Sequence, residues 1–309
     1  MTKLRSNKKD RVVVVGGAGF IGSQVADALV GRGFDVHIID NLSGGKKENI
    51  NPKAVLHTAD IRNLASIKPI IKGAQYVFHL AALPRVQYSI EHPGETHEVN
   101  VTGTINVLIA SKEGGVKRVI YSASSSAYGD QKVMPLVETM IPAPKSPYGL
   151  HKYIGEQYCR VWSEVYGIET VSLRYFNVYG PRLNPEGAYA LAIGKFLKQR
   201  SEGKPLTIWG DGTQTRDFTH VRDVVRANLL AMESTKVGKG EVINIGAGKN
   251  FSVNELVKLI GGSVVREPAR LEPHDTLANN SLAKKLLSWT PEVSLEEGMG
   301  ELKKLYALS

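Results

Sequence analysis

Residues 11–22 read RVVVVGGAGFIG, and this stretch decides the fold. The four valines after Arg11 form a continuous β-branched run, which is typical of a strand buried on both faces of a parallel sheet. Gly16, Gly19 and Gly22 follow at once, and a helical pattern begins at Phe20. A strand, a glycine-rich turn and a helix in this order predict a dinucleotide-binding unit, in which the pyrophosphate lies at the helix N-terminus.

Strands and helices alternate through the first half of the chain. Further strands are predicted at Val36–Ile39, Val55–Asp60, Tyr76–Leu80, Arg118–Ala123 and Glu169–Arg174. The predicted helices are Phe20–Arg32, Thr96–Glu113 and Pro147–Tyr166. This alternation predicts an α/β fold with a Rossmann-type, doubly wound parallel sheet.

The second half changes character after Asn177. We predict helices at Tyr189–Arg200, Val221–Met232, Ser252–Leu259 and Ser294–Tyr306, and strands at Leu206–Trp209 and Glu241–Ile245. Residues 1–176 are predicted to form a dinucleotide-binding domain, to which residues 217–250 return. Residues 177–216 and 251–309 are predicted to form a smaller C-terminal α/β substrate domain.

Composition narrows the classes of function. The 309 residues include 39 Lys and Arg against 30 Asp and Glu, a formal net charge of +9. The positive charges are spread along the chain, so they favour anionic small molecules over nucleic acid. Apolar runs are far shorter than the ~20 residues of a membrane span, and no secretion signal is evident. The lone Cys159 excludes an internal disulfide and a cysteine-based zinc site, so we expect a cytoplasmic protein without a metal.

An acidic residue ends each of the next two predicted strands. Asp40 stands where a carboxylate accepts hydrogen bonds from an adenosine ribose and repels a 2′-phosphate, which favours NAD over NADP. Asp60 could hold the adenine amino group, although either residue could also belong to an ordinary turn.

Tyr148 and Lys152 are four residues apart in a predicted helix and therefore share one face. An ammonium group beside a phenol should lower the phenol pKa and allow it to act as a general base. Ser124 lies at the end of the strand Arg118–Ala123, at the edge where parallel sheets bind ligands. Ser124 could hydrogen-bond a substrate hydroxyl; Ser125 and Ser126 are more readily explained as a polar turn.

Taken together, these residues resemble the extended short-chain dehydrogenase/reductase superfamily over essentially the whole chain. The resemblance extends to residues 79–82 (HLAA) and Asn100. Residues 173–182 (LRYFNVYGPR) and 210–218 (GDGTQTRDF) are similar to those of the NAD-dependent nucleotide-sugar 4-epimerases.

That resemblance implies a reaction. Tyr148, assisted by Ser124, would take the proton of the sugar 4-hydroxyl while hydride passes from C4 to tightly held NAD. The planar 4-keto sugar would rotate, and hydride would return to its other face. Lys152 would hold the nicotinamide ribose. The expected partners are a UDP-sugar and a second copy of the chain, paired through Thr96–Glu113 and Pro147–Tyr166.

The resemblance also implies the site residues. The NAD site would comprise Gly16, Gly19, Phe20, Ile21, Gly22, Asp40, Asn41, Ser43, Asp60, Ile61, Leu80, Ala81, Ala82, Asn100, Ser122, Tyr148, Lys152 and Phe176. The substrate site would comprise Val86, Ser124, Ser125, Ser126, Tyr148, Asn177, Leu191, Thr207, Trp209, Arg216, Arg270 and Thr276. Within it, Arg216 suits a diphosphate, while Thr207 and Trp209 would meet the uracil; Trp209 could equally be a core aromatic.

The sugar itself is less determined. A 4,6-dehydratase would need an Asp–Glu pair and a decarboxylase a Glu near the serine, whereas Ser125 and Ser126 follow Ser124. Asn177 stands where uronic acid epimerases often carry Thr, which favours a neutral hexose. The small Thr276 would leave room for an N-acetyl group, so both UDP-glucose/UDP-galactose and UDP-GlcNAc/UDP-GalNAc are expected. A UDP-glucuronate 4-epimerase, a net NAD-dependent oxidoreductase and a non-catalytic dinucleotide-binding protein remain alternatives.

Overall fold

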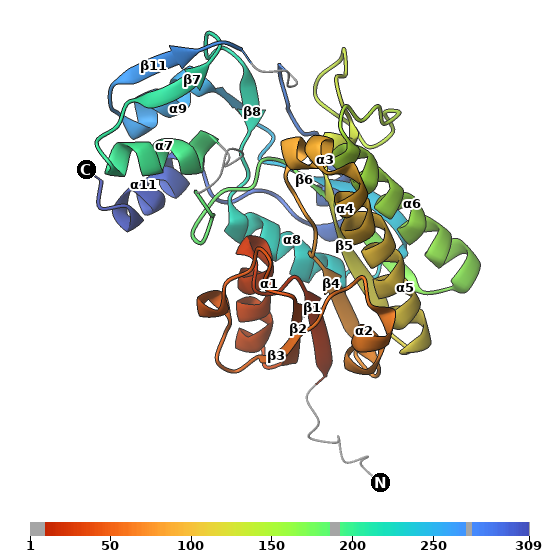
Figure 1. Cartoon of the computed structure of the whole chain (residues 1–309). Coiled ribbons are helices and arrows are strands. Elements are labelled where there is room, and N and C mark those ends of the chain that lie inside the picture. Colours follow the sequence, from red (N-terminus) through yellow and green to blue (C-terminus); the bar gives the residue numbers. More distant parts are fainter. Residues whose placement is uncertain (1–9, 186–191, 270–273, 309) are drawn as a thin grey trace.

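The computed structural model describes residues 10–185, 192–269 and 274–308. Its centre is a seven-stranded sheet in the order β3-β2-β1-β4-β5-β6-β9. Every neighbouring pair in this sheet is parallel. The strands are β1 (Arg11–Val15), β2 (Asp35–Asp40), β3 (Val55–Thr58), β4 (Tyr76–His79), β5 (Arg118–Ser124), β6 (Glu169–Tyr175) and β9 (Lys239–Ile245). The predicted Rossmann-type sheet is therefore confirmed, as Figure 1 shows.

Helices cover both faces of the sheet. One apolar core lies under α1 (Phe20–Gly31) and α8 (Val221–Glu233), and the other lies under α2 (Leu64–Ile71), α5 (Gly103–Glu113) and α6 (Pro147–Tyr166). The predicted helix Thr96–Glu113 is not uniform, because α4 (Pro93–His97) and α5 are joined by a π-helical stretch, Glu98–Thr102. Three short elements complete this part of the described chain: α3 (Val86–Glu91) and the 3₁₀ turns Lys47–Asn49 and Ser125–Ala127.

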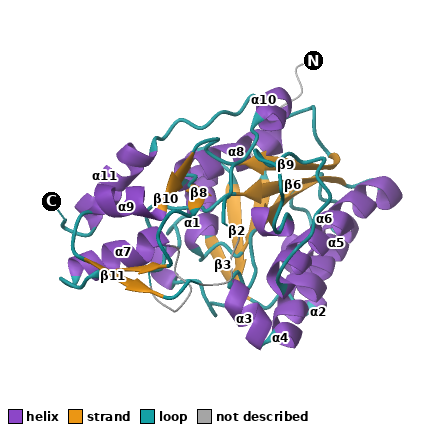
Figure 2. Ribbon diagram, turned by 90° about the horizontal axis from the view of Figure 1, so that it is seen from above, coloured by secondary structure: helices purple, strands orange, loops and turns teal. Residues whose placement is uncertain are grey.

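A second lobe lies beside the carboxyl edge of the sheet (Figure 2). It has its own core, which includes Phe196, Ile208 and Leu256. Its elements are α7 (Ala192–Ser201), β7 (Leu206–Trp209), β8 (Thr215–Asp217), β10 (Asn250–Ser252), α9 (Val253–Ile260), β11 (Val264–Glu267) and α11 (Leu295–Leu305). By contrast, α10 (Ser281–Leu287) lies within the predicted substrate domain but packs with Trp289 into the core around α8. The predicted start of α7 at Tyr189 falls outside the described residues.

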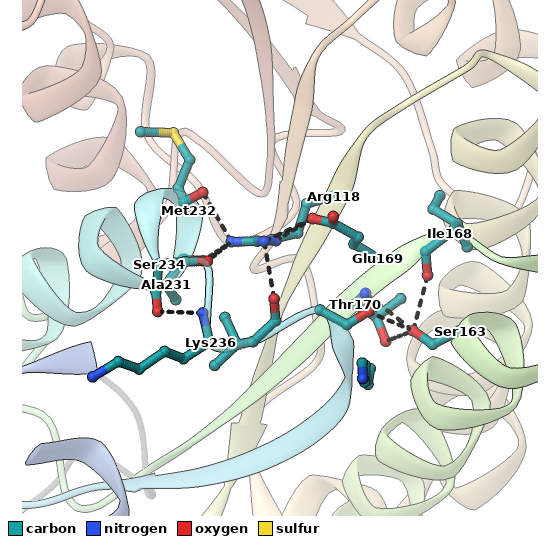
Figure 3. Close-up of polar contacts among 12 residues, drawn as sticks. Arg118, Ser163, Ile168, Glu169, Thr170, Ala231, Met232, Ser234 and Lys236 are labelled. Atoms are coloured by element: carbon teal, nitrogen blue, oxygen red, sulfur yellow. Dashed lines mark hydrogen bonds and ion pairs between the residues drawn. The ribbon is translucent and has the colours of Figure 1, made fainter. Parts of the chain in front are cut away.

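At the amino ends of the strands, Arg118, the first residue of β5, binds the segment that follows α8 and the end of that helix. Its guanidinium donates to the carbonyl oxygens of Ala231, Met232, Ser234 and Val237 at 2.7 to 3.0 Å, and it pairs with Glu169 at 2.7 Å (Figure 3). Because the last carbonyls of a helix lack partners within it, Arg118 caps the C-terminal end of α8 and ties it to the sheet.

Two features that the described residues lack bear on function. None of the helices there is both long and apolar enough to cross a bilayer. In the same part of the chain, His, Cys, Asp and Glu do not gather in groups of three or more that could hold a metal ion.

Candidate active site

The glycine loop lies at the point where the strand order reverses, between β1 and β4. Gly16 has φ +83°, and a Cβ there would lie 2.5 Å from the backbone nitrogen of Ala81. A Cβ on Gly22 would lie 2.1 Å from the carbonyl oxygen of Gly16. The loop therefore packs backbone against backbone at the N-terminus of α1. Dinucleotides bind at such a switch point because the helix N-terminus offers N–H groups to phosphate.

Asp40 closes the end of β2 against this loop. One carboxylate oxygen accepts the N–H of Ala18 at 2.9 Å and the other accepts the N–H of Leu42 at 2.8 Å. Each oxygen of an ionised carboxylate has a second lone pair, so Asp40 can still accept from a ribose hydroxyl. The predicted acid thus also shapes the loop, which the sequence pattern did not indicate.

Asn41, Ser43 and Asp60 come together beside Asp40. The Asn41 amide donates to Asp60 at 3.0 Å and its oxygen accepts from the Ser43 hydroxyl at 2.7 Å. Arg62 binds Asp60 through two nitrogens at 3.0 and 2.7 Å, and this interaction is the main cause that lowers the Asp60 pKa to about 2. Arg62 was missed from the sequence, although its spacing of two residues from Asp60 could have indicated the pair.

The segment after β4 forms the next wall. Gly16 packs against Leu80 and Ala81, and Ala82 continues the same half-buried stretch. Asn100 reaches this segment from the π-helical turn: its oxygen accepts the N–H of Leu83 at 2.8 Å and its amide donates to the Leu83 carbonyl at 3.1 Å. Asn100 therefore holds the backbone of the wall.

Other predicted NAD residues divide into two groups. Gly19, Phe20, Ile21 and Ser122 lie at the loop or at the end of β5, as expected. Ile61 and Phe176 are buried side chains instead: Ile61 packs on Gly103, and the fully buried Phe176 packs with Tyr128, Leu136 and Ala278. Apolar burial holds the Phe176 ring in this core cluster, and its contribution to the NAD site stays a prediction.

Ser124, Tyr148 and Lys152 converge at the carboxyl edge of the sheet. Ser124 ends β5, and Tyr148 and Lys152 lie in the first two turns of α6. Tyr148 is 9% exposed and Lys152 4%. The Lys152 ammonium donates to the carbonyl oxygen of Ser122 at 2.7 Å. Both polar groups are thus buried, and both face the end of β5.

The pKa values of Tyr148 and Lys152 differ from the expectation based on the sequence. Burial raises the pKa of Tyr148, while a hydrogen bond with Ser124 acts in the opposite direction. Lys152 is not among the causes that shift the Tyr148 pKa in this structure, where its ammonium binds the Ser122 carbonyl, so the expected lowering of that pKa by Lys152 is not found. Burial also lowers the Lys152 pKa to about 8, against the opposing influence of Glu156. A group poised near neutral pH in a buried cluster is typical of acid–base chemistry.

Glu156 and Arg174 form an ion pair behind Lys152 that the sequence did not reveal. The guanidinium of Arg174 binds both Glu156 oxygens at 2.8 and 2.7 Å, and it lies 4.4 Å from the centre of the Tyr128 ring. Glu156 is fully buried and follows Lys152 by one helical turn. The Glu156 carboxylate places negative charge near the lysine, and its partner Arg174 connects α6 to β6 and, through Tyr128, to the turn that follows Ser124.

Asn177 and Thr276 meet at the start of the second lobe, although 99 residues separate them. The Asn177 amide donates to the Thr276 hydroxyl at 3.3 Å and to the Asp217 carbonyl at 3.0 Å. Arg216 precedes Asp217 in β8, and its guanidinium donates to the carbonyls of Thr215 and His274. The structure therefore brings Asn177 and Thr276 into contact and places Arg216 one residue from Asp217, whose backbone both of them bind. The predicted substrate residues Leu191 and Arg270 lie outside the described residues.

The predicted uracil residues lie on β7. Gln199 of α7 donates to the Thr207 hydroxyl at 2.7 Å and accepts the Thr207 N–H at 3.1 Å. Trp209 is half-buried, with the Lys195 ammonium 3.7 Å from its ring centre. Val86 is exposed on α3, and Ser125 and Ser126 form the turn after Ser124. Gln199 and Lys195 were not predicted, since each acts only through packing of α7 on β7.

Comparison with known proteins decides the family. The model of a family described as "NAD dependent epimerase/dehydratase family" matches residues 12–246, which is most of the chain. The chain belongs to this NAD-dependent epimerase/dehydratase family.

Relatives within the family match the chain over nearly its full length. A putative UDP-glucose 4-epimerase of Methanocaldococcus jannaschii is 41% identical, with 93% of this chain and 95% of that protein covered. The UDP-glucose 4-epimerase of Thermotoga maritima, solved with UDP-glucose, superposes with a TM-score of 0.92 at 41% identity and covers 96% of this chain and 98% of its own. A UDP-N-acetylglucosamine 4-epimerase of Methanobrevibacter ruminantium M1, solved with UDP-N-acetylmuramic acid, gives 0.92 at 37% identity, with 97% and 99% covered.

The family cofactor fits the residues of this chain. NAD needs a phosphate cradle without side chains and an acid for the ribose. The close approach of Gly16 and Gly22 and the placement of Asp40 at the end of β2 provide both. NAD is therefore the cofactor of this family member, and the glycine loop, Asp40 and the Asn41–Asp60 group are the residues that would hold it.

Proposed function

We propose that the protein is a UDP-sugar 4-epimerase that interconverts UDP-glucose with UDP-galactose and UDP-GlcNAc with UDP-GalNAc. The observation that carries this proposal is the convergence of Ser124, Tyr148 and Lys152 at the carboxyl end of β5, two strands along the sheet from the glycine loop after β1. An acid–base group next to a dinucleotide site is the equipment for reversible oxidation of an alcohol.

Each residue has a defined task in this reaction. NAD supplies, when bound, a reversible acceptor for the hydrogen on sugar C4. Tyr148 takes the proton of the 4-hydroxyl, and Ser124 stabilises the deprotonated phenol through its hydrogen bond. Lys152 provides positive charge beneath the site. After the planar 4-keto sugar turns about its link to the diphosphate, Tyr148 returns the proton to the oxygen of the inverted alcohol.

The residues proposed to bind the UDP-sugar lie in the second lobe and at the start of the chain segment that leads into it. Arg216 offers a fork of donors suited to a diphosphate, and Asn177 begins the wall that meets the sugar. The edge of β7 at Thr207 and Trp209 is the proposed uracil site. The Gln199 amide pairs with the Thr207 N–H and hydroxyl, so this edge accepts a donor–acceptor pair of the kind a pyrimidine presents, and uracil would take the place of that amide.

The direct test is incubation of the enzyme and NAD with each UDP-sugar, followed by proton NMR of the product. We expect the C4 epimer to form without an accumulation of free reduced cofactor. Deuterium at C4 should stay on C4. Loss of the deuterium, or stoichiometric release of reduced cofactor, would instead support a net oxidoreductase.

Thr276 is the proposed determinant of sugar size. Its hydroxyl contacts Asn177 and also accepts the N–H of Asp217 at 3.3 Å, so its side chain belongs to the wall beside Asn177. We expect Thr276→Tyr to lower kcat/KM for the N-acetylated pair by at least about tenfold, because the larger ring occupies the N-acetyl space. Activity on the glucose and galactose pair should change by less than about threefold.

Thr276→Ser is the matched control for that change. It keeps the hydroxyl that binds Asn177 and Asp217 and adds no volume, so both substrate pairs should be turned over. Steady-state kinetics on the four sugars make the comparison. An equal loss on both pairs in Thr276→Tyr would refute the proposed size selection.

A UDP-glucuronate 4-epimerase is the second candidate, since it would need the same three residues. Asn177 favours the neutral sugars, and adding UDP-glucuronate to the NMR assay decides between them.

We also propose a homodimer through α5 and α6. Val161, Val165 and Tyr166 on α6 are 37%, 65% and 48% exposed, which supports an apolar contact there. The buried, free Cys159 is compatible with the proposed cytoplasmic location.

A further inference from the structure

The first turn of α6 has an unusual hydrogen-bond partner. Pro147 opens the helix and has no N–H, and the side chain of Ser146 caps the N–H of Gly149 at 3.1 Å. The N–H of Tyr148, the next residue, donates instead to the hydroxyl of Ser89, a residue of α3, at 3.0 Å.

Ser89 is built into this position. It is 0% exposed, and its hydroxyl donates in turn to the Val86 carbonyl at 2.5 Å. The hydroxyl therefore uses its one proton within α3 and keeps its acceptor side for Tyr148. A buried N–H without a partner is costly, so this bond ties the backbone of Tyr148 to α3.

The opposite side of the same turn is held as tightly. A Cβ on Gly149 would lie 2.6 Å from the carbonyl oxygen of Ser126, so the helix backbone rests directly on the turn after Ser124. The segment that carries Ser89 is itself fixed at Leu83 by Asn100. The first turn of α6 thus lies between α3 and the serine turn, and each contact sets where the Tyr148 phenol lies relative to Ser124.

We propose that Ser89 is a positioning residue for Tyr148, which acts by holding the first turn of α6 against the serine turn. The proposal rests on the proposed role of Tyr148 as the acid–base group. The hydrogen bond of Ser89 is to the main-chain N–H of Tyr148, away from the phenol hydroxyl. Its removal should therefore change how well Tyr148 is aligned and charged, with little effect on how tightly substrate binds.

The surroundings of Tyr148 define what a change in its pKa would mean. The groups near it that titrate or carry charge are Lys152 and Glu156 on α6, Tyr121 on β5 and, beyond Lys152, His79 on β4. His151 on α6 stacks edge-on with His97 of α4. Ser89 and Ser146 do not titrate, so replacing either of them leaves all these charges in place.

The test compares Ser89→Ala with Ser146→Ala in the NAD-loaded enzyme. Both variants remove one side-chain acceptor from the first turn of α6, so both should lower the melting temperature. Only Ser89→Ala frees the Tyr148 backbone. We expect its kcat to fall by about tenfold or more with KM for the UDP-sugar within about twofold, since small misplacements of a reacting group are costly. Ser146→Ala should keep both constants.

Two further measurements keep the proposal open to refutation. The tyrosinate absorbance that is lost in Tyr148→Phe reports the pKa of Tyr148 without turnover, and Ser89→Ala should raise this pKa because alignment with Ser124 weakens. Ser89→Cys, which keeps a weak acceptor in a slightly larger side chain, should fall between wild type and Ser89→Ala and serves if the alanine variant does not fold.

The outcomes separate the two proposals. If the wild type epimerises and Ser89→Ala matches it, or if both serine variants lose kcat equally, the positioning role is overturned and the function stands. If the wild type epimerises no UDP-sugar, the proposed function fails. The absorbance titration then decides the role of Ser89 by itself: a pKa of Tyr148 unchanged by Ser89→Ala overturns it, and a raised pKa upholds it.

Discussion

Replacing Tyr148 by Phe should lower kcat for epimerisation by about a thousandfold, the usual contribution of a positioned acid–base group. The phenylalanine keeps the buried ring and removes only the hydroxyl that exchanges the substrate proton. We therefore expect little change in KM, in NAD binding or in the melting temperature. Steady-state kinetics with NMR detection of the epimer measure the effect.

Tyr158→Phe provides the matched control for this prediction. Tyr158 lies on the same helix, and its ring packs edge-on against Trp162 at 5.6 Å. Removing its hydroxyl should leave turnover unchanged. A Tyr148→Phe enzyme with more than about a tenth of wild-type turnover would show that another group moves the proton.

The pH profile gives an independent reading of the same residue. Tyr148 works as a base only when deprotonated, so activity should rise with pH through its pKa. Because the hydrogen bond between Tyr148 and Ser124 lowers that pKa, Ser124→Ala should move the rising limb of activity to higher pH. Lys152 loses its charge as the pH rises through about 8 in the chain itself, which should weaken its support of the phenolate at alkaline pH.

Gly22→Ala should abolish tight binding of NAD, with an affinity loss of at least about a hundredfold. The added Cβ would lie 2.1 Å from the Gly16 carbonyl oxygen and 3.0 Å from the Gly17 Cα. Both obstacles are backbone, so the glycine loop would have to move away from α1 and would lose the geometry that receives the pyrophosphate. Fluorescence titration of the apoenzyme with NAD measures the loss.

Gly31→Ala is the control within the same helix. A Cβ at Gly31 meets nothing within 4 Å, so this change should leave NAD affinity at the wild-type value. Alanine is also the better helix former, which should keep or slightly raise stability. If Gly22→Ala binds NAD as well as Gly31→Ala does, the loop does not cradle the phosphates in the way proposed.

The main sheet could be predicted because its strands carry strong local patterns. The valines of β1 and the apolar residues of β5 are buried on both faces, so composition alone reveals them. Other elements lack such a signal. All four residues of β11 are exposed, and α2 contains Pro69, which reads as a break in a helix. Their place in the fold comes from partners distant in the sequence.

The same distinction applies to the site. Ser124, Tyr148, Lys152 and the glycines could be predicted because each has a fixed spacing to a strand or helix end. Ser89, Glu156 and Gln199 each act through one tertiary contact, with α6, β6 and β7 respectively, and no spacing marks them. Phe176 shows that a sequence match to a site does not reveal where the side chain packs, since its ring is buried in a core cluster.

The path of the chain between the main sheet and the second lobe limits how the enzyme can move. The polypeptide passes from one to the other after β6, before α8, after β9, before α10 and before α11. A single flexible linker would permit a wide rotation of one lobe against the other, whereas several crossings restrain such a rotation. The substrate site should therefore discriminate among sugars by the shape of the side chains that line it, and mutations that change specificity should be sought there and not at a hinge.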